Sequence, residues 1–205
     1  QFRLPSLRLF LAQAVRTFVR FPFAIVIAVS GTTVAVVAEG VASQIADVTL
    51  QKAILMTLFG LPLAVAVVML AEGRGWTWTR IRAIELSVML LMALFYAFVL
   101  PRSGDYLHLY DSHRIFALTI AAFLSVIWAP FLVSRDTQAV WQYTAKLILR
   151  LFFVVVFTAA LYLGVLLILE SLQYLFSIEI ADRLRFQIWT VFAGVFAVWG
   201  FLAGF

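Results

Sequence analysis

The sequence has no cysteine, only two histidines and few charged residues, and each shortage excludes a class of protein. Without cysteine, the 205 residues form no disulfide, iron–sulfur cluster, thiolate-ligated zinc site or thiol nucleophile. Charged residues make up 12% of the chain and hydrophobic residues 65%, whereas a soluble domain is about a quarter charged. A soluble fold of this size leaves about 30% of its unfolded-chain surface exposed to water, so it could not bury so large a share of hydrophobic residues. The composition therefore predicts an integral membrane protein.

The net charge of +5 would suggest a nucleic acid as partner if the protein were soluble. Basic residues at a membrane surface give the same excess, because they interact with anionic lipid headgroups. We therefore expect the bilayer and its anionic headgroups as partners, further membrane proteins as possible partners, and no nucleic acid. Nothing in the sequence indicates a cofactor.

Six apolar stretches have, or nearly have, the roughly 20 residues that a helix needs to cross a bilayer. They are apolar on every face, unlike the short alternating strands of a membrane β-barrel. The fold class expected is all-α, a polytopic membrane protein with about six transmembrane helices. The stretches are Phe21–Ala38, Ala53–Ala71, Ile84–Leu100, Ile115–Val133, Leu151–Leu169 and Ile188–Phe205.

Residues 1–20 differ from the rest, and we expect them to form a basic amphipathic helix in the membrane interface, ahead of a six-helix domain at 21–205. Apolar residues recur there at helical spacing, with arginines largely between them. A soluble helix packed on another domain is the alternative. Because the chain starts at Gln1 rather than Met and stops at Phe205 inside an apolar run, we expect a fragment of a longer protein.

Lysine and arginine are distributed unevenly between the two sets of alternating loops. One set, together with the N-terminal segment, carries ten of them, and the other carries five. Cytoplasmic loops are richer in these residues, so both termini are expected in the cytoplasm.

Four glutamates adjoin the expected spans, and an ionisable group near the bilayer centre usually marks function. Glu39 and Glu170 lie about 28–30 Å along their helices from Arg20 and Arg150, which places both near the outer interface. We expect Glu72 and Glu85 near the cytoplasmic ends of their spans, where they could pair with the loop arginines Arg74, Arg80 or Arg82. Structural ion pairs and charges that snorkel to the interface explain all four. The alternative, a proton or cation pathway, would require Glu39 and Glu170 to converge across helices.

Enzymatic and metal chemistry find little support. Both histidines fall in the stretch Pro101–Arg114, where Asp105, His108, Asp111 and His113 have no spacing typical of a metal site. A solvated polar loop is the simpler interpretation, and no metal is expected. The sequence has neither a GxSxG elbow nor a glycine-rich phosphate loop.

Small residues in the last span predict close helix packing. Their spacing of i, i+4, i+7 and i+11 forms one stripe, through which a neighbouring helix can approach. A helix of the same chain and a partner protein are both possible neighbours, and the first is favoured. The stripe consists of Ala193, Ala197, Gly200 and Gly204. Weaker signals of the same kind are Gly31 with Ala35 and Ala160 with Gly164, and Pro62 and Pro130 are expected to kink their spans.

Four phrases together resemble the bacterial membrane family of domain of unknown function 4153. They are Arg20-Phe21-Pro22, Leu61-Pro62-Leu63 continuing to Leu70-Ala71-Glu72, Trp141-Gln142-Tyr143 with Lys146 and Leu149-Arg150, and Trp199 to Gly204. The chain departs from the family pattern at Thr144, where Asn is usual, and at Gly200, where an aromatic residue is usual. The resemblance implies a bacterial inner-membrane location and further helices after this region. It implies no activity, because the family has none established.

Three functional hypotheses follow. A non-catalytic scaffold or accessory subunit of a membrane complex is favoured by the shortage of ionisable groups inside the spans. A transporter or permease module is motivated by Pro62, Pro130, Glu39 and Glu170. A membrane enzyme is the least supported, because only the stretch with His108 and His113 offers a cluster of catalytic side chains.

Overall fold

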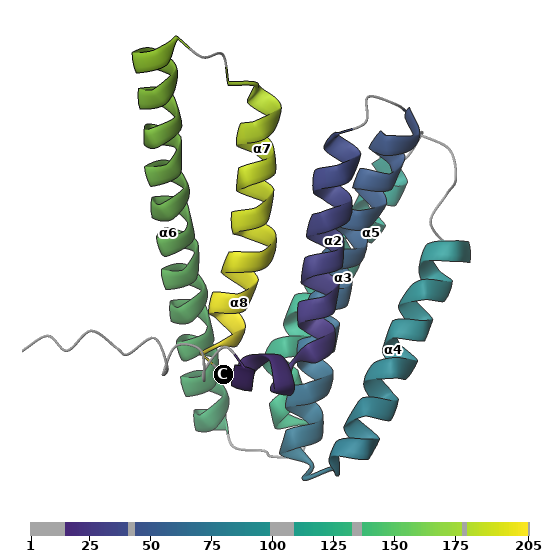
Figure 1. Cartoon of the computed structure of the whole chain (residues 1–205). Coiled ribbons are helices and arrows are strands. Elements are labelled where there is room, and N and C mark those ends of the chain that lie inside the picture. The colour runs from purple at the N-terminus through teal and green to yellow at the C-terminus, as the bar shows by residue number, and fades with distance from the viewer. Residues whose placement is uncertain (1–14, 41–43, 99–108, 133–136, 178–179, 205) are drawn as a thin grey trace, which may run out of the picture.

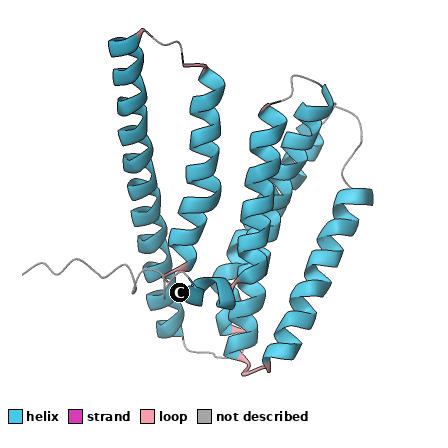
Figure 2. Ribbon diagram, viewed as in Figure 1, coloured by secondary structure: helices cyan, strands magenta, loops and turns pink. Residues whose placement is uncertain are grey.

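A computed structural model describes residues 15–40, 44–98, 109–132, 137–177 and 180–204. Within these ranges the chain is helical and has no strand (Figure 2). The all-α prediction is therefore confirmed. Most of the expected interfacial helix lies outside the described residues, but 15–20 is helical and lies across one end of the bundle (Figure 1).

Successive long helices run in alternating directions, so that the described N-terminal and C-terminal segments meet at the same end of the bundle (Figure 1). We call this the basic end, because it carries Arg16, Arg20, Arg74, Arg80 and Arg82, and we call the other the opposite end. In chain order the elements are α2 (Pro22–Glu39), α3 (Gln44–Gly73), α4 (Trp78–Phe98), α5 (Leu109–Trp128) with the 3-10 turn η1 (Ala129–Phe131), α6 (Thr137–Phe176), α7 (Asp182–Val191), the π-helical turn η2 (Phe192–Phe196) and α8 (Ala197–Leu202).

Four helices in the described part of the chain are long and apolar enough to cross a membrane. They are Pro22–Glu39, Leu50–Gly73, Gln138–Phe176 and Asp182–Leu202, and Ile115–Phe131 is a shorter apolar helix. The expectation of about six is thus met only in part. The stretch expected at Ile84–Leu100 belongs to α4, whose first turns carry Arg80, Arg82 and Glu85.

Local sequence explains where several helices begin and end. Pro22 occupies the first turn of α2, where its missing N–H costs nothing. Asp182 lies in the first turn of α7, where a carboxylate interacts favourably with the helix dipole. Gly75, with a positive φ of 63°, makes the turn after α3. Pro130 ends α5 rather than kinking it, since the chain changes there to η1.

The core lies at the basic end, where α2, α3, α5, η1 and α8 meet. α2 contributes a row of small buried side chains at helical spacing, among them Ala24, Ala28 and Ala35, so that neighbouring helices can approach closely. The C-terminal Leu202 is 1% exposed and belongs to the same cluster as Phe21. Both described ends of the chain are therefore held in one core.

α6 is the outlying element. Its 40 residues span about 60 Å, roughly twice the hydrocarbon thickness of a bilayer. Only 6% of its apolar window is buried within the chain, compared with 50% for Leu50–Gly73. Figure 1 shows α6 beside α7 and α8, on the side of the bundle away from α4.

The stripe of small residues expected in the last span is divided in the structure. Gly200 and Gly204 face α6, because a Cβ added to them would approach Val154 and Arg150. Ala193 instead lines a cavity beside α2 and α3, and Ala197 is half-buried. The π-turn η2 explains the change, since it fits an extra residue into one turn and rotates the face that follows.

Candidate functional site

The ion pairs of the described residues lie in two layers, one at each end of the bundle. At the basic end Arg20 donates to both carboxylate oxygens of Glu72, at 2.9 and 2.6 Å. The sequence pattern predicted a loop arginine as the partner of Glu72, but the helical segment before α2 supplies it. This pair ties 15–20 to the end of α3. About a third of each side chain is exposed.

A second ion pair at the basic end joins Glu85 to Arg82, one turn earlier on α4, with Nη1 and Oε2 2.5 Å apart. Arg82 also donates to the carbonyl of Val19 at 2.7 Å. Its guanidinium lies over the rings of Trp78 and Phe23. The Glu85 side chain is 1% exposed, so this pair reaches into the bundle. Arg80, on the same helix, is exposed.

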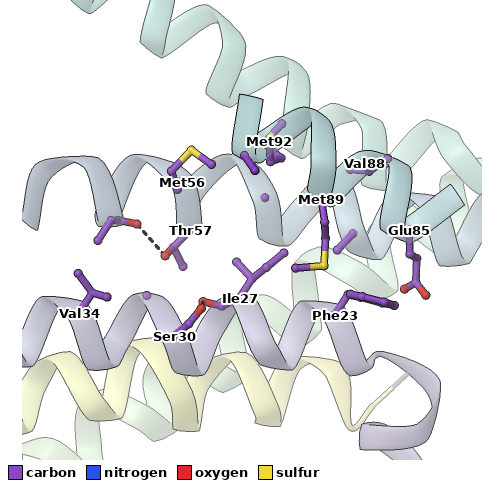
Figure 3. A pocket seen from close by; sticks show the side chains of 15 residues that line it. Phe23, Ile27, Ser30, Val34, Met56, Thr57, Glu85, Val88, Met89 and Met92 are labelled. Atoms are coloured by element: carbon purple, nitrogen blue, oxygen red, sulfur yellow. Dashed lines mark hydrogen bonds between the residues drawn. The ribbon is translucent and has the colours of Figure 1, made fainter. Parts of the chain in front are cut away.

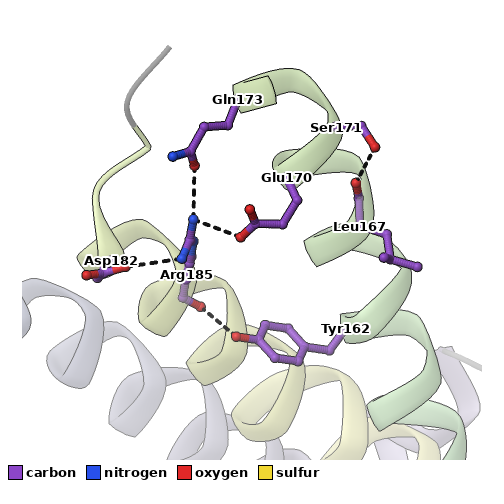
Figure 4. Close-up of polar contacts among 7 residues, drawn as sticks. All are labelled: Tyr162, Leu167, Glu170, Ser171, Gln173, Asp182 and Arg185. Atoms are coloured by element: carbon purple, nitrogen blue, oxygen red, sulfur yellow. Dashed lines mark hydrogen bonds and ion pairs between the residues drawn. The ribbon is translucent and has the colours of Figure 1, made fainter. Parts of the chain in front are cut away.

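At the opposite end, Arg185 of α7 binds several groups at once (Figure 4). Its guanidinium contacts Glu170 at 2.8 Å and Asp182 at 3.2 Å, and donates to Gln173 at 3.0 Å. The hydroxyl of Tyr162 donates to the carbonyl of Arg185 at 3.4 Å. These contacts hold the ends of α6 and α7 together.

Glu39 and Glu170 are carried by helices that lie on the two sides of α7. Glu39 ends α2, where a Cβ on the following Gly40 would approach Arg183 of α7. Glu170 pairs with Arg185 on the α6 side. Figure 1 shows α7 between α6 and α2. Neither glutamate lines the two cavities described below.

An apolar cavity of about 440 Å³ lies between α2, α3 and α4. Figure 3 shows Glu85 and Phe23 at one end of it and Val34 at the other, with methionine side chains between them. The walls combine aliphatic and thioether groups with a few hydroxyls and one carboxyl. The residues that define it best are Phe23, Ile27, Met56, Met89, Met92 and Glu85.

A second apolar cavity of similar volume lies on the other side of α2 and α3, against α7 and η2. Pro62 of α3 and Ala193 of η2 are part of its wall. Gly31 and Thr57 border both cavities, so the contact of α2 with α3 separates them.

Among the described glycines, the two at which an added Cβ would come closest to a neighbouring side chain each face a threonine. A Cβ added to Gly31 would overlap the hydroxyl of Thr57, and one added to Gly194 would overlap the hydroxyl of Thr32. The sequence pattern placed Gly31 only among weaker signals and missed Gly194. An added Cβ on Gly164, by contrast, meets nothing within 4 Å.

Little of the histidine-bearing stretch lies within the described residues. Asp105 and His108 lie outside the described residues, and His113 is exposed near the start of α5. Among the residues that the structure describes, no three of His, Cys, Asp and Glu are grouped closely enough to hold a metal ion.

Glu85 is the site residue whose burial the sequence pattern did not predict. It was expected as a peripheral ion-pair partner, whereas the structure buries it at the end of a cavity. The signal available was its position three residues after Arg82, because a pair one turn apart lets a carboxylate enter the bundle with its counter-ion. No protein-family model, curated protein or solved structure matches the chain.

Proposed function

We propose that this chain is a non-catalytic component of a bacterial inner membrane, which acts as a scaffold or accessory subunit of a membrane complex. In this proposal α4 and α5 also cross the bilayer, giving six crossings. The basic end faces the cytoplasm and the Arg185 cluster faces outward. Membership of the family of domain of unknown function 4153 is part of the same proposal, on the motifs quoted above.

The observation that carries the proposal is the engagement of the ionisable side chains at the two ends of the bundle. Arg20 binds Glu72, Arg82 binds Glu85, and Arg185 binds Glu170 and Asp182. Groups held in such pairs fix helix ends, whereas a proton or ion pathway needs ionisable groups along the middle of the helices. The long α6 fits the same function, because little of it is covered by this chain.

The permease hypothesis is the second candidate function. It requires Glu39 and Glu170 to meet at one water-filled cavity, and neither residue lines the two cavities described above. Glu170 is also engaged by Arg185. The two cavities between helices are lined mainly by apolar side chains.

Photo-crosslinking from the membrane face tests the proposal. A benzoylphenylalanine at Phe153 of α6, which is 61% exposed, should yield one discrete protein adduct in native membranes. The same group at Leu90 of α4, 64% exposed, serves as the matched control and should react mainly with lipid. Extraction in mild detergent and mass spectrometry should then recover the crosslinked protein in constant stoichiometry. Recovery of the chain alone, with only lipid adducts at both positions, would contradict the proposal.

The proposed orientation has its own test, because the 205 residues contain no cysteine. Thr77→Cys places a thiol in the α3–α4 turn at the basic end, and Ser177→Cys places one just after α6 at the opposite end; both positions are exposed. A membrane-impermeant maleimide added to intact spheroplasts should label only the Ser177→Cys chain. Labelling of the Thr77→Cys chain alone would show that the orientation is the reverse of the one proposed.

A further inference from the structure

Glu85 presents a buried hydrogen-bond acceptor that no group in the described part of the chain satisfies. Its Oε2 is bound by Arg82, but its Oε1 has no partner. Arg82 is itself occupied, since its other terminal nitrogen donates to the carbonyl of Val19. Buried polar atoms in proteins are nearly always paired, so an unpaired one at a cavity indicates a ligand that donates a hydrogen bond.

The cavity beyond Glu85 has the chemistry of a hydrocarbon site. Met56, Met89 and Met92 line it, and thioether side chains are flexible enough to adapt to a mobile chain. Its hydroxyl groups are already engaged, because Ser30 and Thr57 donate to backbone carbonyls of their own helices. Its volume of about 440 Å³ lies within the usual range of small-molecule sites, about 300–1,000 Å³.

The polar end of the cavity lies toward the basic end of the bundle. Glu85 follows Trp78 and Arg80 by two turns or less, and such residues mark the membrane interface. The apolar part runs along α4 from Glu85 to Ala93, about 12 Å by helical rise. An amphiphile in the adjacent leaflet has the same orientation, with its polar group near the interface and its chain toward the bilayer centre.

We propose that this cavity binds a neutral, hydroxyl-bearing amphiphile, such as a long-chain alcohol or a glyceride. The hydroxyl donates to Oε1 of Glu85, and the hydrocarbon chain lies among the methionines. A neutral head fits because Arg82 already balances the charge of Glu85: an ammonium would add an uncompensated buried charge, and an anionic head would face the carboxylate. The proposal goes beyond the scaffold function and does not depend on any protein partner.

The experiment uses the full chain in nanodiscs of phosphatidylcholine, a lipid without a hydroxyl donor. The probe is hexadecanol with a diazirine in its chain, and the readout is the photo-adduct, mapped by mass spectrometry. We expect adducts at Met56, Met89 or Met92. Unlabelled hexadecanol should compete at least about tenfold better than hexadecane or palmitate, a factor comparable to one hydrogen bond to a charged group.

Two variants and one control complete the test. Glu85→Leu removes the acceptor and should weaken labelling at least about tenfold. Met89→Trp fills the cavity while leaving the Glu85–Arg82 pair intact, and should abolish the adducts. Leu90→Trp introduces the same indole one residue further along α4, at an exposed position, and should leave the adducts unchanged.

Equal labelling of all chains would overturn the proposal, as would equal competition by the alcohol and the alkane. Should Glu85→Leu fail to fold, the comparison of labelling in Met89→Trp with labelling in Leu90→Trp still tests the proposal. If the chain is recovered alone from native membranes but binds the alcohol in nanodiscs, the scaffold function is refuted and this site stands, so the two failures are distinguishable.

Discussion

The contact between Gly31 and Thr57 gives the sharpest test of how this bundle holds together. Gly31 on α2 allows the backbone to approach Thr57 on α3 so closely that a methyl group at 31 would overlap the threonine hydroxyl. The Cβ and Cγ2 of Thr57 would lie 3.2 and 3.4 Å from the added carbon. We therefore predict that Gly31→Ala destabilises the protein.

The expected magnitude follows from two opposing effects. Alanine stabilises a helix by about 0.5–1 kcal/mol relative to glycine. Overpacking costs about 1–3 kcal/mol, because Thr57 is stiff at χ1 and its hydroxyl is held by the carbonyl of Ala53 at 2.8 Å. Gly164→Ala on α6 has the first effect without the second, since its added carbon meets nothing within 4 Å. The two variants should therefore differ by about 1–3 kcal/mol.

The assay is thermal unfolding in a mild detergent, followed by tryptophan fluorescence or by size-exclusion of the heated sample. For a chain of about 200 residues, 1 kcal/mol corresponds to about 2–4 °C, so Gly31→Ala should melt roughly 2–12 °C below Gly164→Ala. Thr57→Ala in the same chain removes the obstruction, and the double variant should recover most of the difference. Equal melting of Gly31→Ala and Gly164→Ala, or no recovery in the double variant, would refute the close contact.

Three further predictions concern contacts made elsewhere in the bundle. Gly194→Ala should also lower the melting temperature, and Thr32→Ala should partly restore it in the same assay, because η2 and α2 approach as α2 and α3 do. Arg20→Glu should destabilise, and the exchanged pair Arg20→Glu with Glu72→Arg should recover about 0.5–1 kcal/mol in a double-mutant cycle, a small value because both groups are partly exposed. Arg185→Gln should increase amide hydrogen exchange at the adjoining ends of α6 and α7, with no increase at the basic end; unchanged exchange there would show that apolar contacts alone join these helices.

The sequence by itself determined the helical class, the positions of the apolar helices and the two-sided distribution of charge. An apolar run of bilayer length crosses lipid as a helix, because a helix pairs every backbone polar group inside its own segment. Arginine counts in the loops likewise need no tertiary structure. The apolar runs reappear as α2, α3, α6 and α7–α8, with α4 and α5 between them.

The tertiary structure alone decided which faces meet. A helix that is apolar all round carries no periodicity to show which side packs on protein and which on lipid, so Gly31 and Gly164 look alike in sequence although only Gly31 is in close contact. The π-turn η2 broke the predicted stripe between Ala193 and Gly200, because local spacing cannot reveal an extra residue in a turn. The pairing of Glu72 with Arg20, 52 residues apart, and the burial of Glu85 at a cavity both depend on how the helices assemble.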